Sequence, residues 1–135
     1  MSGAQALVHR QLCEAVIMEN RTKGMLGEVR AEQYLKEKGF EILAHNYAAP
    51  GAEVDLIALD GEVVVFAEVK MRSTGFSQGR EAVTLAKQRR ICKGALHYMM
   101  KNGLMNRQAR FDVIEIQGGR TTHIVDAFPY QGPAF

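Results

Sequence analysis

Hydrophobic and polar residues alternate along residues 53–70 in the pattern of two β-strands joined by a tight turn. Asp60-Gly61 lies at the centre of this segment and is typical of a two-residue hairpin turn, because glycine readily adopts positive φ. The segment therefore predicts a β-hairpin.

The register of this hairpin follows from the turn. With Leu59 opposite Glu62, the pairing places Glu53 opposite Glu68 and Asp55 diagonal to Glu68. One face of the hairpin is then wholly apolar. It comprises Val54, Leu56, Ala58, Val63, Val65, Ala67 and Val69. The other face is apolar near the turn and ionisable at the open end, so we expect both faces to be covered.

The remaining periodicity predicts three helices and two further strands. The helices are expected at residues 5–19, 25–38 and 85–101, and the strands at 111–116 and 121–128. Gly39 is a helix stop and Thr84 a helix cap. This order of elements predicts a single α/β domain with a central mixed β-sheet flanked by helices.

Composition agrees with one ordinary globular domain, since the chain has 135 residues of which 47% are hydrophobic. Its two cysteines, Cys13 and Cys92, have neither the spacing of a zinc site nor that of a disulfide scaffold. No segment resembles a signal peptide or a membrane span. We therefore expect a cytoplasmic protein without membrane contact.

Charge is distributed unevenly along the chain. Residues 70–107 carry nine basic and one acidic side chains, whereas residues 1–69 carry six and eleven. Part of the basic set recurs at helical spacing, and such side chains contact phosphates in nucleic-acid complexes. The candidate phosphate ligands are Arg72, Arg80, Lys87, Arg89, Arg90, Lys93 and Lys101. A solvated helix face is the alternative interpretation of the same pattern.

Three carboxylates crowd the open end of the predicted hairpin: Glu53, Asp55 and Glu68. In a covered site they would repel one another and take up protons unless a cation held them. Oxygen ligands favour Mg²⁺ or Mn²⁺ over zinc. Lys70 lies on the same face of the predicted hairpin as these carboxylates. The alternative to a metal site is therefore an internal salt bridge between Lys70 and one of the carboxylates.

Two helical residues extend this candidate site. Glu28 shares a helical stripe with Ala31 and Leu35, which directs its carboxylate towards the sheet. Gln88 lies on the apolar stripe of the second long helix, where a buried amide needs polar partners.

Several short motifs together resemble the YraN family of bacterial proteins. They are Gly27-Glu28, Gly51-Ala52-Glu53-Val54-Asp55-Leu56-Ile57-Ala58, Phe66-Ala67-Glu68-Val69-Lys70, Lys87-Gln88-Arg89-Arg90 and Arg110-Phe111-Asp112-Val113. That family is regarded as having the restriction-endonuclease-like PD-(D/E)xK fold, distantly similar to archaeal Holliday junction resolvases. The resemblance implies a metal held by Asp55 and Glu68, with Glu53 in the same motif. It also implies that Lys70 positions the attacking water, and that Glu28 and Gln88 are the helix residues of the site.

We thus expect an N-terminal extension at residues 1–23, an endonuclease-like domain at 24–128 and a tail at 129–135. The expected activity is Mg²⁺- or Mn²⁺-dependent hydrolysis of phosphodiester bonds in branched or structured DNA. A non-catalytic nucleic-acid- or partner-binding module is the main alternative, and a hydrolase of small phosphorylated substrates is a third. A homodimer would supply the two sites that a two-fold junction requires.

Overall fold

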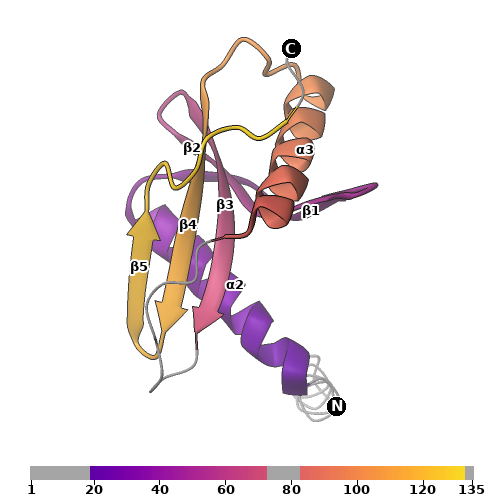
Figure 1. Ribbon diagram of the computed structural model, residues 1–135. Helices are drawn as coiled ribbons and strands as arrows, with labels where there is room; N and C mark the ends of the chain where they lie inside the picture. Colours follow the sequence, from indigo (N-terminus) through magenta and orange to yellow (C-terminus); the bar gives the residue numbers. More distant parts are fainter. Residues whose placement is uncertain (1–18, 73–82, 133–135) are drawn as a thin grey trace, which may run out of the picture.

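A computed structural model describes residues 19–72 and 83–132 of the chain. The elements are α2 (Glu19–Glu37), β1 (Glu41–Ala49), β2 (Ala52–Asp60), β3 (Val63–Arg72), α3 (Leu85–Lys101), β4 (Ala109–Gln117) and β5 (Arg120–Ile124). The strands form one sheet in the order β1-β2-β3-β4-β5, in which only β3 and β4 are parallel. This mixed sheet between two helices confirms the predicted α/β class and is consistent with a restriction-endonuclease-like arrangement (Figure 1).

Helix α2 ends where the sequence predicts. Gly39 has φ of +91°, and its amide donates to Lys36 O at 3.0 Å. The next amide, that of Phe40, donates to Leu35 O at 2.9 Å, which completes a Schellman motif. The start of α2 differs from the prediction, because the helix begins at Glu19 rather than near residue 25. The helix predicted at residues 5–19 otherwise lies outside the described residues.

The β2–β3 hairpin forms with a register that differs from the prediction by two residues. Asp60 pairs with Val63, so the turn is Gly61-Glu62 rather than Asp60-Gly61. Gly61 has φ of +61° at the first turn position, as a type II′ turn requires. A shift of two preserves which side chains share a face. The predicted pairing of Glu53 with Glu68 is wrong.

Each face of the sheet packs against one helix. On one face Ala31 and Leu35 of α2 pack with Leu56, Ala58 and Ala67. On the opposite face, residues of α3 pack with residues of β2, β3 and β4. The buried members there are Val54, Ile57, Val64, Phe66, Val83, Ile91, Cys92, Ala95, Met99, Phe111, Val113 and Phe128.

Val54 is therefore not on the face predicted for it. It belongs to the cluster under α3, whereas Leu56 packs under α2. Helix α3 approaches β2 closely here, since a Cβ on Gly94 would lie 2.9 Å from Val54 Cγ2 and 3.5 Å from the backbone nitrogen of Glu53. This contact fixes the acidic end of β2 beside the first half of α3.

Two strands depart from the sequence prediction. β1 was not expected; it is an edge strand whose residues are all half-buried or exposed, and its register shifts between Ile42 and Ala44. β5 ends at Ile124, so residues 125–128 of the last predicted strand are irregular. Neither helix in the described residues combines the length and the apolar run needed to cross a bilayer.

Candidate functional site

Asp55 and Glu68 meet where β2 and β3 stop pairing. The last paired residues are Leu56 and Ala67, and the two acids are the next residues on their strands. Asp55 Oδ2 accepts a hydrogen bond of 2.8 Å from the amide of Val69, which holds its carboxylate against β3. The Glu68 side chain is only 10% exposed, and its Oε2 atom has no hydrogen-bond partner among the described residues.

Glu68 is energetically unusual for a carboxyl group. Burial, and then repulsion from Asp55, raises its pKa to about 8. A buried acid with an unpartnered oxygen next to a second acid fits an oxygen-binding cation such as Mg²⁺ or Mn²⁺. Within the described part of the chain, no three His, Cys, Asp or Glu side chains are grouped to hold a metal ion. The donor set consists of Asp55 and Glu68.

Glu53 is engaged by basic side chains of α3. Its Oε1 atom accepts a hydrogen bond from Lys87 Nζ and lies 3.3 Å from Arg90 Nη2. The hydrogen bond from Lys87 holds the pKa of Glu53 below its usual value. Lys87 Nζ also lies 3.8 Å from Glu68 Oε1. Lys87, which the sequence indicated only as a phosphate ligand, is thus the ion-pair partner of the acids.

Lys70 has a different environment from Lys87. It is half-buried on β3, forms no ion pair among the described residues, and lowers the pKa of Glu68 by its charge. The salt bridge considered as the alternative for Lys70 is therefore made by Lys87 instead.

No hydrogen bond or ion pair among the described residues joins Gln88 or Glu28 to the acid pair. Gln88 Nε2 donates to Val83 O at 2.9 Å, so the start of α3 satisfies this amide locally. Glu28 is half-buried on α2, the helix on the opposite face from α3. Its neighbour Gly27 approaches β3 so closely that a Cβ would lie 2.6 Å from Met71 Cγ. Glu28 thus lies level with the end of β3 that carries Lys70.

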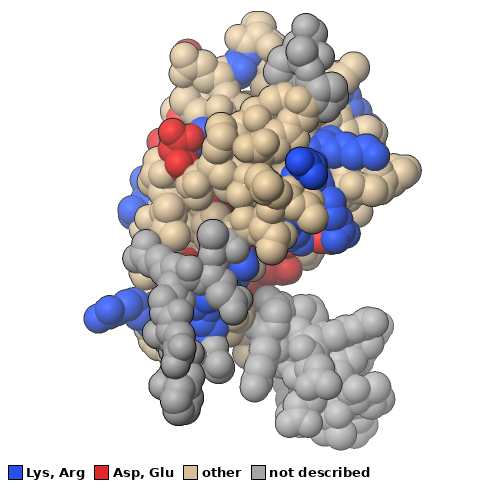
Figure 2. Space-filling view, viewed as in Figure 1, with Lys and Arg blue, Asp and Glu red and all other residues tan. Residues whose placement is uncertain are grey.

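The solvent-exposed side of α3 is basic. Figure 2 shows Lys and Arg side chains gathered over α3, with Asp and Glu side chains at the edge of the same surface. The exposed basic residues of this surface are Arg89, Arg90, Lys93, His97 and Lys101. Arg89 and Lys93 also line a hollow with Leu96 and the C-terminal residues Gln131 and Gly132.

Two other predicted phosphate ligands are placed differently. The Arg72 side chain is 15% exposed, and its Nη2 atom lies 3.1 Å from Glu115 Oε1 on the neighbouring strand. Arg80 lies outside the described residues. Arg72 therefore links β3 to β4 in this structure.

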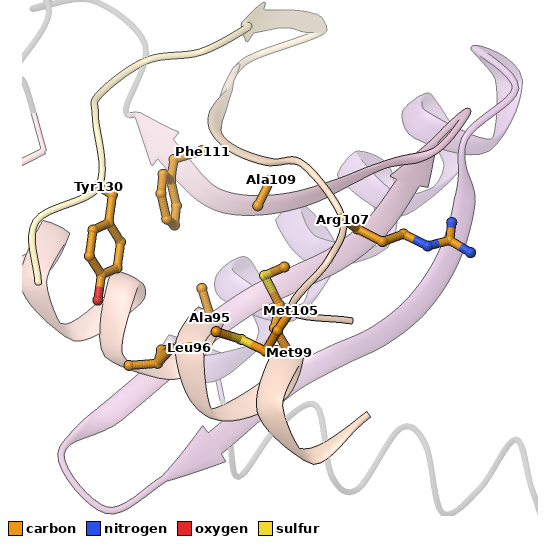
Figure 3. Close-up of a pocket in the computed structure, with 8 residues that line it drawn as sticks. All are labelled: Ala95, Leu96, Met99, Met105, Arg107, Ala109, Phe111 and Tyr130. Carbon is orange, nitrogen blue, oxygen red and sulfur yellow. The ribbon is translucent and has the colours of Figure 1, made fainter. Parts of the chain in front are cut away.

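An apolar pocket of about 200 Å³ lies between the second half of α3 and β4. Met99, Met105, Phe111 and Tyr130 are among its lining residues, and the guanidinium of Arg107 extends away from them (Figure 3). Among its lining residues, only Arg107 and Tyr130 carry ionisable side chains.

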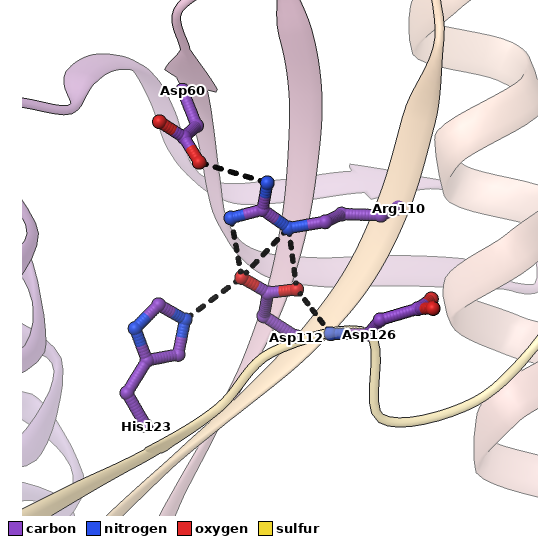
Figure 4. A network of polar contacts seen from close by, with 5 residues as sticks. All are labelled: Asp60, Arg110, Asp112, His123 and Asp126. Atoms are coloured by element: carbon purple, nitrogen blue, oxygen red, sulfur yellow. Dashed lines mark hydrogen bonds and ion pairs between the residues drawn. The ribbon is translucent and has the colours of Figure 1, made fainter.

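A buried polar network that was not predicted from the sequence lies on the α2 face. Asp112 is fully buried and accepts hydrogen bonds from Arg110, from the amide of Asp126 and from the ring of His123, while Arg110 also binds Asp60 (Figure 4). A charged residue inside the apolar strand 111–116 was the available signal. The same signal identified Asp55 and Glu68.

Comparison with known proteins identifies the family. The model for "Uncharacterised protein family UPF0102" matches residues 27–116. A UPF0102 protein of Desulforapulum autotrophicum is 44% identical over 103 residues, covering 73% of this chain and 84% of that protein. A relative from Geobacter sulfurreducens is 41% identical over 115 residues, which cover 81% of this chain and 90% of that protein. A relative from Clostridioides difficile is 41% identical over 114 residues, which cover 82% of this chain and 100% of that protein. Since the matched region holds both acids and both site lysines, and spans most of the described fold, the chain belongs to the UPF0102 family, that is, the YraN family.

Proposed function

We propose that this protein is a Mg²⁺- or Mn²⁺-dependent endonuclease that acts on branched or structured DNA. The observation that carries the proposal is the acid pair. Asp55 and Glu68 adjoin each other where β2 and β3 stop pairing, and one buried Glu68 oxygen has no partner in the part of the chain that the structure describes. The basic surface of α3 lies beside this pair and suits a polyanion.

Each part of the site has a distinct role in this proposal. Asp55 and Glu68 would hold the divalent ion, which supplies positive charge at the scissile phosphate. Lys70, which has no carboxylate partner among the described residues, orients the attacking water and stabilises charge that develops on the phosphate. Arg89 and Lys93 bind phosphates along the backbone and so read shape rather than sequence. A two-fold junction would be cut by a homodimer with one site in each subunit.

A non-catalytic nucleic-acid- or partner-binding module is the second candidate. The observation that favours it is the ion pairing of Glu53 with Lys87 and Arg90, because it neutralises part of the acidic cluster without a metal. In such a protein the acids would serve the packing of α3 on β2.

Calorimetric titration of the protein with Mn²⁺ distinguishes these two functions. We expect the wild type to bind one Mn²⁺ per chain and Asp55→Ala to lose this binding. Glu62→Gln, which changes an exposed acid in the β2–β3 turn, is the matched control and should bind as the wild type does. Absence of Mn²⁺ uptake by the wild type at millimolar concentration would overturn the nuclease proposal in favour of the binding module.

A further inference from the structure

Building on the proposed function, we infer that Lys87 is a further residue of the same site. Its ammonium group holds the carboxylates together until a divalent ion displaces it, and it then binds the phosphate of the substrate. Lys87 is thus the counter-ion of the acids before a metal binds and a ligand of the DNA afterwards.

The contacts of Lys87 are those of a counter-ion. Its Nζ atom donates to Glu53 Oε1 and lies 3.8 Å from Glu68 Oε1, and its side chain is only 26% exposed. Burial alone would lower the pKa of Lys87, but Glu53, Glu68 and Asp55 together raise it above its usual value. All three carboxylates therefore attract the same ammonium group.

The backbone of Lys87 is held while its side chain can move. Its amide donates to Thr84 Oγ1 at 3.2 Å, in the cap that starts α3. The four-carbon side chain can move its charge without any movement of the helix. A divalent ion on Asp55 and Glu68 would repel the ammonium group strongly at such short range.

The position of Lys87 also explains where the displaced charge goes. Arg90, one helical turn further along α3, binds the same Glu53 oxygen at 3.3 Å and is exposed. An ammonium released from Glu68 thus remains next to the basic surface of α3, where the DNA backbone is proposed to lie. Lys70, in contrast, forms no ion pair with any residue that the structure describes, so it has no such partner to leave.

The test compares the Mn²⁺ affinity of three full-length proteins by calorimetry: wild type, Lys87→Met and Lys36→Met. Lys36 is the matched control, because it is also paired with a glutamate, Glu32 at 3.2 Å, but on the other helix. We expect Lys87→Met to bind Mn²⁺ about ten-fold or more tightly than the wild type, because a competing positive charge is lost. Lys36→Met should stay within two-fold of the wild type. Lys87→Gln repeats the test with a polar side chain in case the methionine variant folds poorly.

A second measurement on the same proteins uses junction DNA without metal. Without a divalent ion Lys87 still neutralises the carboxylates, so Lys87→Met leaves their negative charge beside the DNA and should bind this DNA several-fold more weakly than the wild type. The two affinities therefore change in opposite directions. A purely structural role for Lys87 would weaken both.

The outcomes separate this inference from the nuclease proposal. If the wild type binds Mn²⁺ but Lys87→Met binds it no more tightly, the counter-ion role is overturned and the nuclease proposal stands. If only Lys87→Met binds Mn²⁺, and the double variant with Asp55→Ala does not, the counter-ion role stands while metal-dependent activity of the wild type is overturned. If neither protein binds Mn²⁺, both are overturned.

Discussion

Arg110 Nε donates to Asp112 Oδ1 at 3.0 Å, although the two residues lie on the same strand and Asp112 is fully buried. Arg110 Nη1 reaches Asp60 Oδ2 at 2.8 Å, and the His123 ring binds Asp112 Oδ2 at 2.7 Å. The Asp112 carboxylate therefore links β4 to β5 directly, and Arg110 connects it to Asp60 on β2. Because this network lies on the face opposite the acid pair, its contribution is to stability.

Asp112→Asn should destabilise the protein by roughly 2–4 kcal/mol at pH 7, the range for a broken buried ion-pair network. Burial opposes ionisation of Asp112, but hydrogen bonds from His123, Arg110 and the Asp126 amide keep its pKa below the usual value. Its stabilising effect is therefore present above pH 3.8 and lost as the pH falls through the lowered pKa. Urea unfolding at several pH values across this range should show that the free energies of unfolding of wild type and Asp112→Asn become more similar as the pH falls.

The control for this experiment is Asp126→Asn. Asp126 joins the network through its backbone amide, and its side chain is exposed. An equal loss of stability in both variants would contradict the role assigned to the Asp112 carboxylate.

Glu68→Gln should stabilise the metal-free protein at neutral and alkaline pH. The pKa of Glu68 is about 8 in the folded state and near 4.5 in the unfolded chain, so the folded state binds more protons between these values. Wild-type stability therefore falls as the pH rises through this window, and the advantage of the variant grows by up to about 1.4 kcal/mol per pH unit. Thermal unfolding of both proteins at several pH values measures this difference in stability. A constant difference between wild type and variant would contradict the raised pKa.

Gly94→Ala should destabilise the protein by roughly 1–3 kcal/mol, although alanine favours helices over glycine by about 1 kcal/mol. The new Cβ would lie 2.9 Å from Val54 Cγ2, a buried β-branched side chain with little freedom to move. Gly119→Ala is the control, since nothing lies within 4 Å of its added Cβ. Chemical unfolding of both variants tests the close approach of α3 to β2, and a stabilised Gly94→Ala would refute it.

Lys70→Ala should separate binding from cleavage. If Lys70 acts chiefly in the transition state, the variant binds Mn²⁺ and junction DNA within a few fold of the wild type but loses about 10²-fold or more in single-turnover cleavage. Asp55→Ala, by comparison, should lose metal binding and cleavage together. Equal cleavage by wild type and Lys70→Ala would remove Lys70 from the mechanism.

Replacing both Arg89 and Lys93 by alanine should weaken DNA binding to a similar extent for unrelated sequences. Each phosphate contact contributes about −0.9 to the slope of log K against log salt, so the slope should flatten by roughly 1.8. Arg120→Ala, an exposed cation on β5, should leave the slope unchanged. Fluorescence anisotropy at several salt concentrations measures these slopes. If the double variant keeps the wild-type slope, the surface of α3 is a solvated face.

The sequence predicts elements well where local chemistry specifies them. Gly39 and Thr84 bound the two described helices, as expected from their backbone preferences. The hairpin register was wrong by two because Gly61 can occupy either central position of a two-residue turn, and only the packing of the whole sheet selects one. β1 escaped detection because an edge strand with a register shift has no clean alternation.

The acids of the candidate site were predictable from the sequence, but their ion pair with Lys87 was not. Asp55 and Glu68 stood out as ionisable residues in apolar strands, and the structure makes them neighbours. The ion pair of Lys87 with Glu53 joins residues 34 positions apart. That pair depends on how closely α3 packs over β2, which no local pattern encodes.

The order of the elements has a consequence for synthesis on the ribosome. The β2–β3 hairpin is local in sequence, so its two acids can come together within microseconds of leaving the exit tunnel. The parallel partner of β3 begins only at Ala109, after α3 has been made. A nascent chain that ends before Lys87 therefore carries the acids without their counter-ion, and α3 neutralises them only as translation proceeds. The acids of the site are therefore synthesised before Lys87, the base that pairs with them.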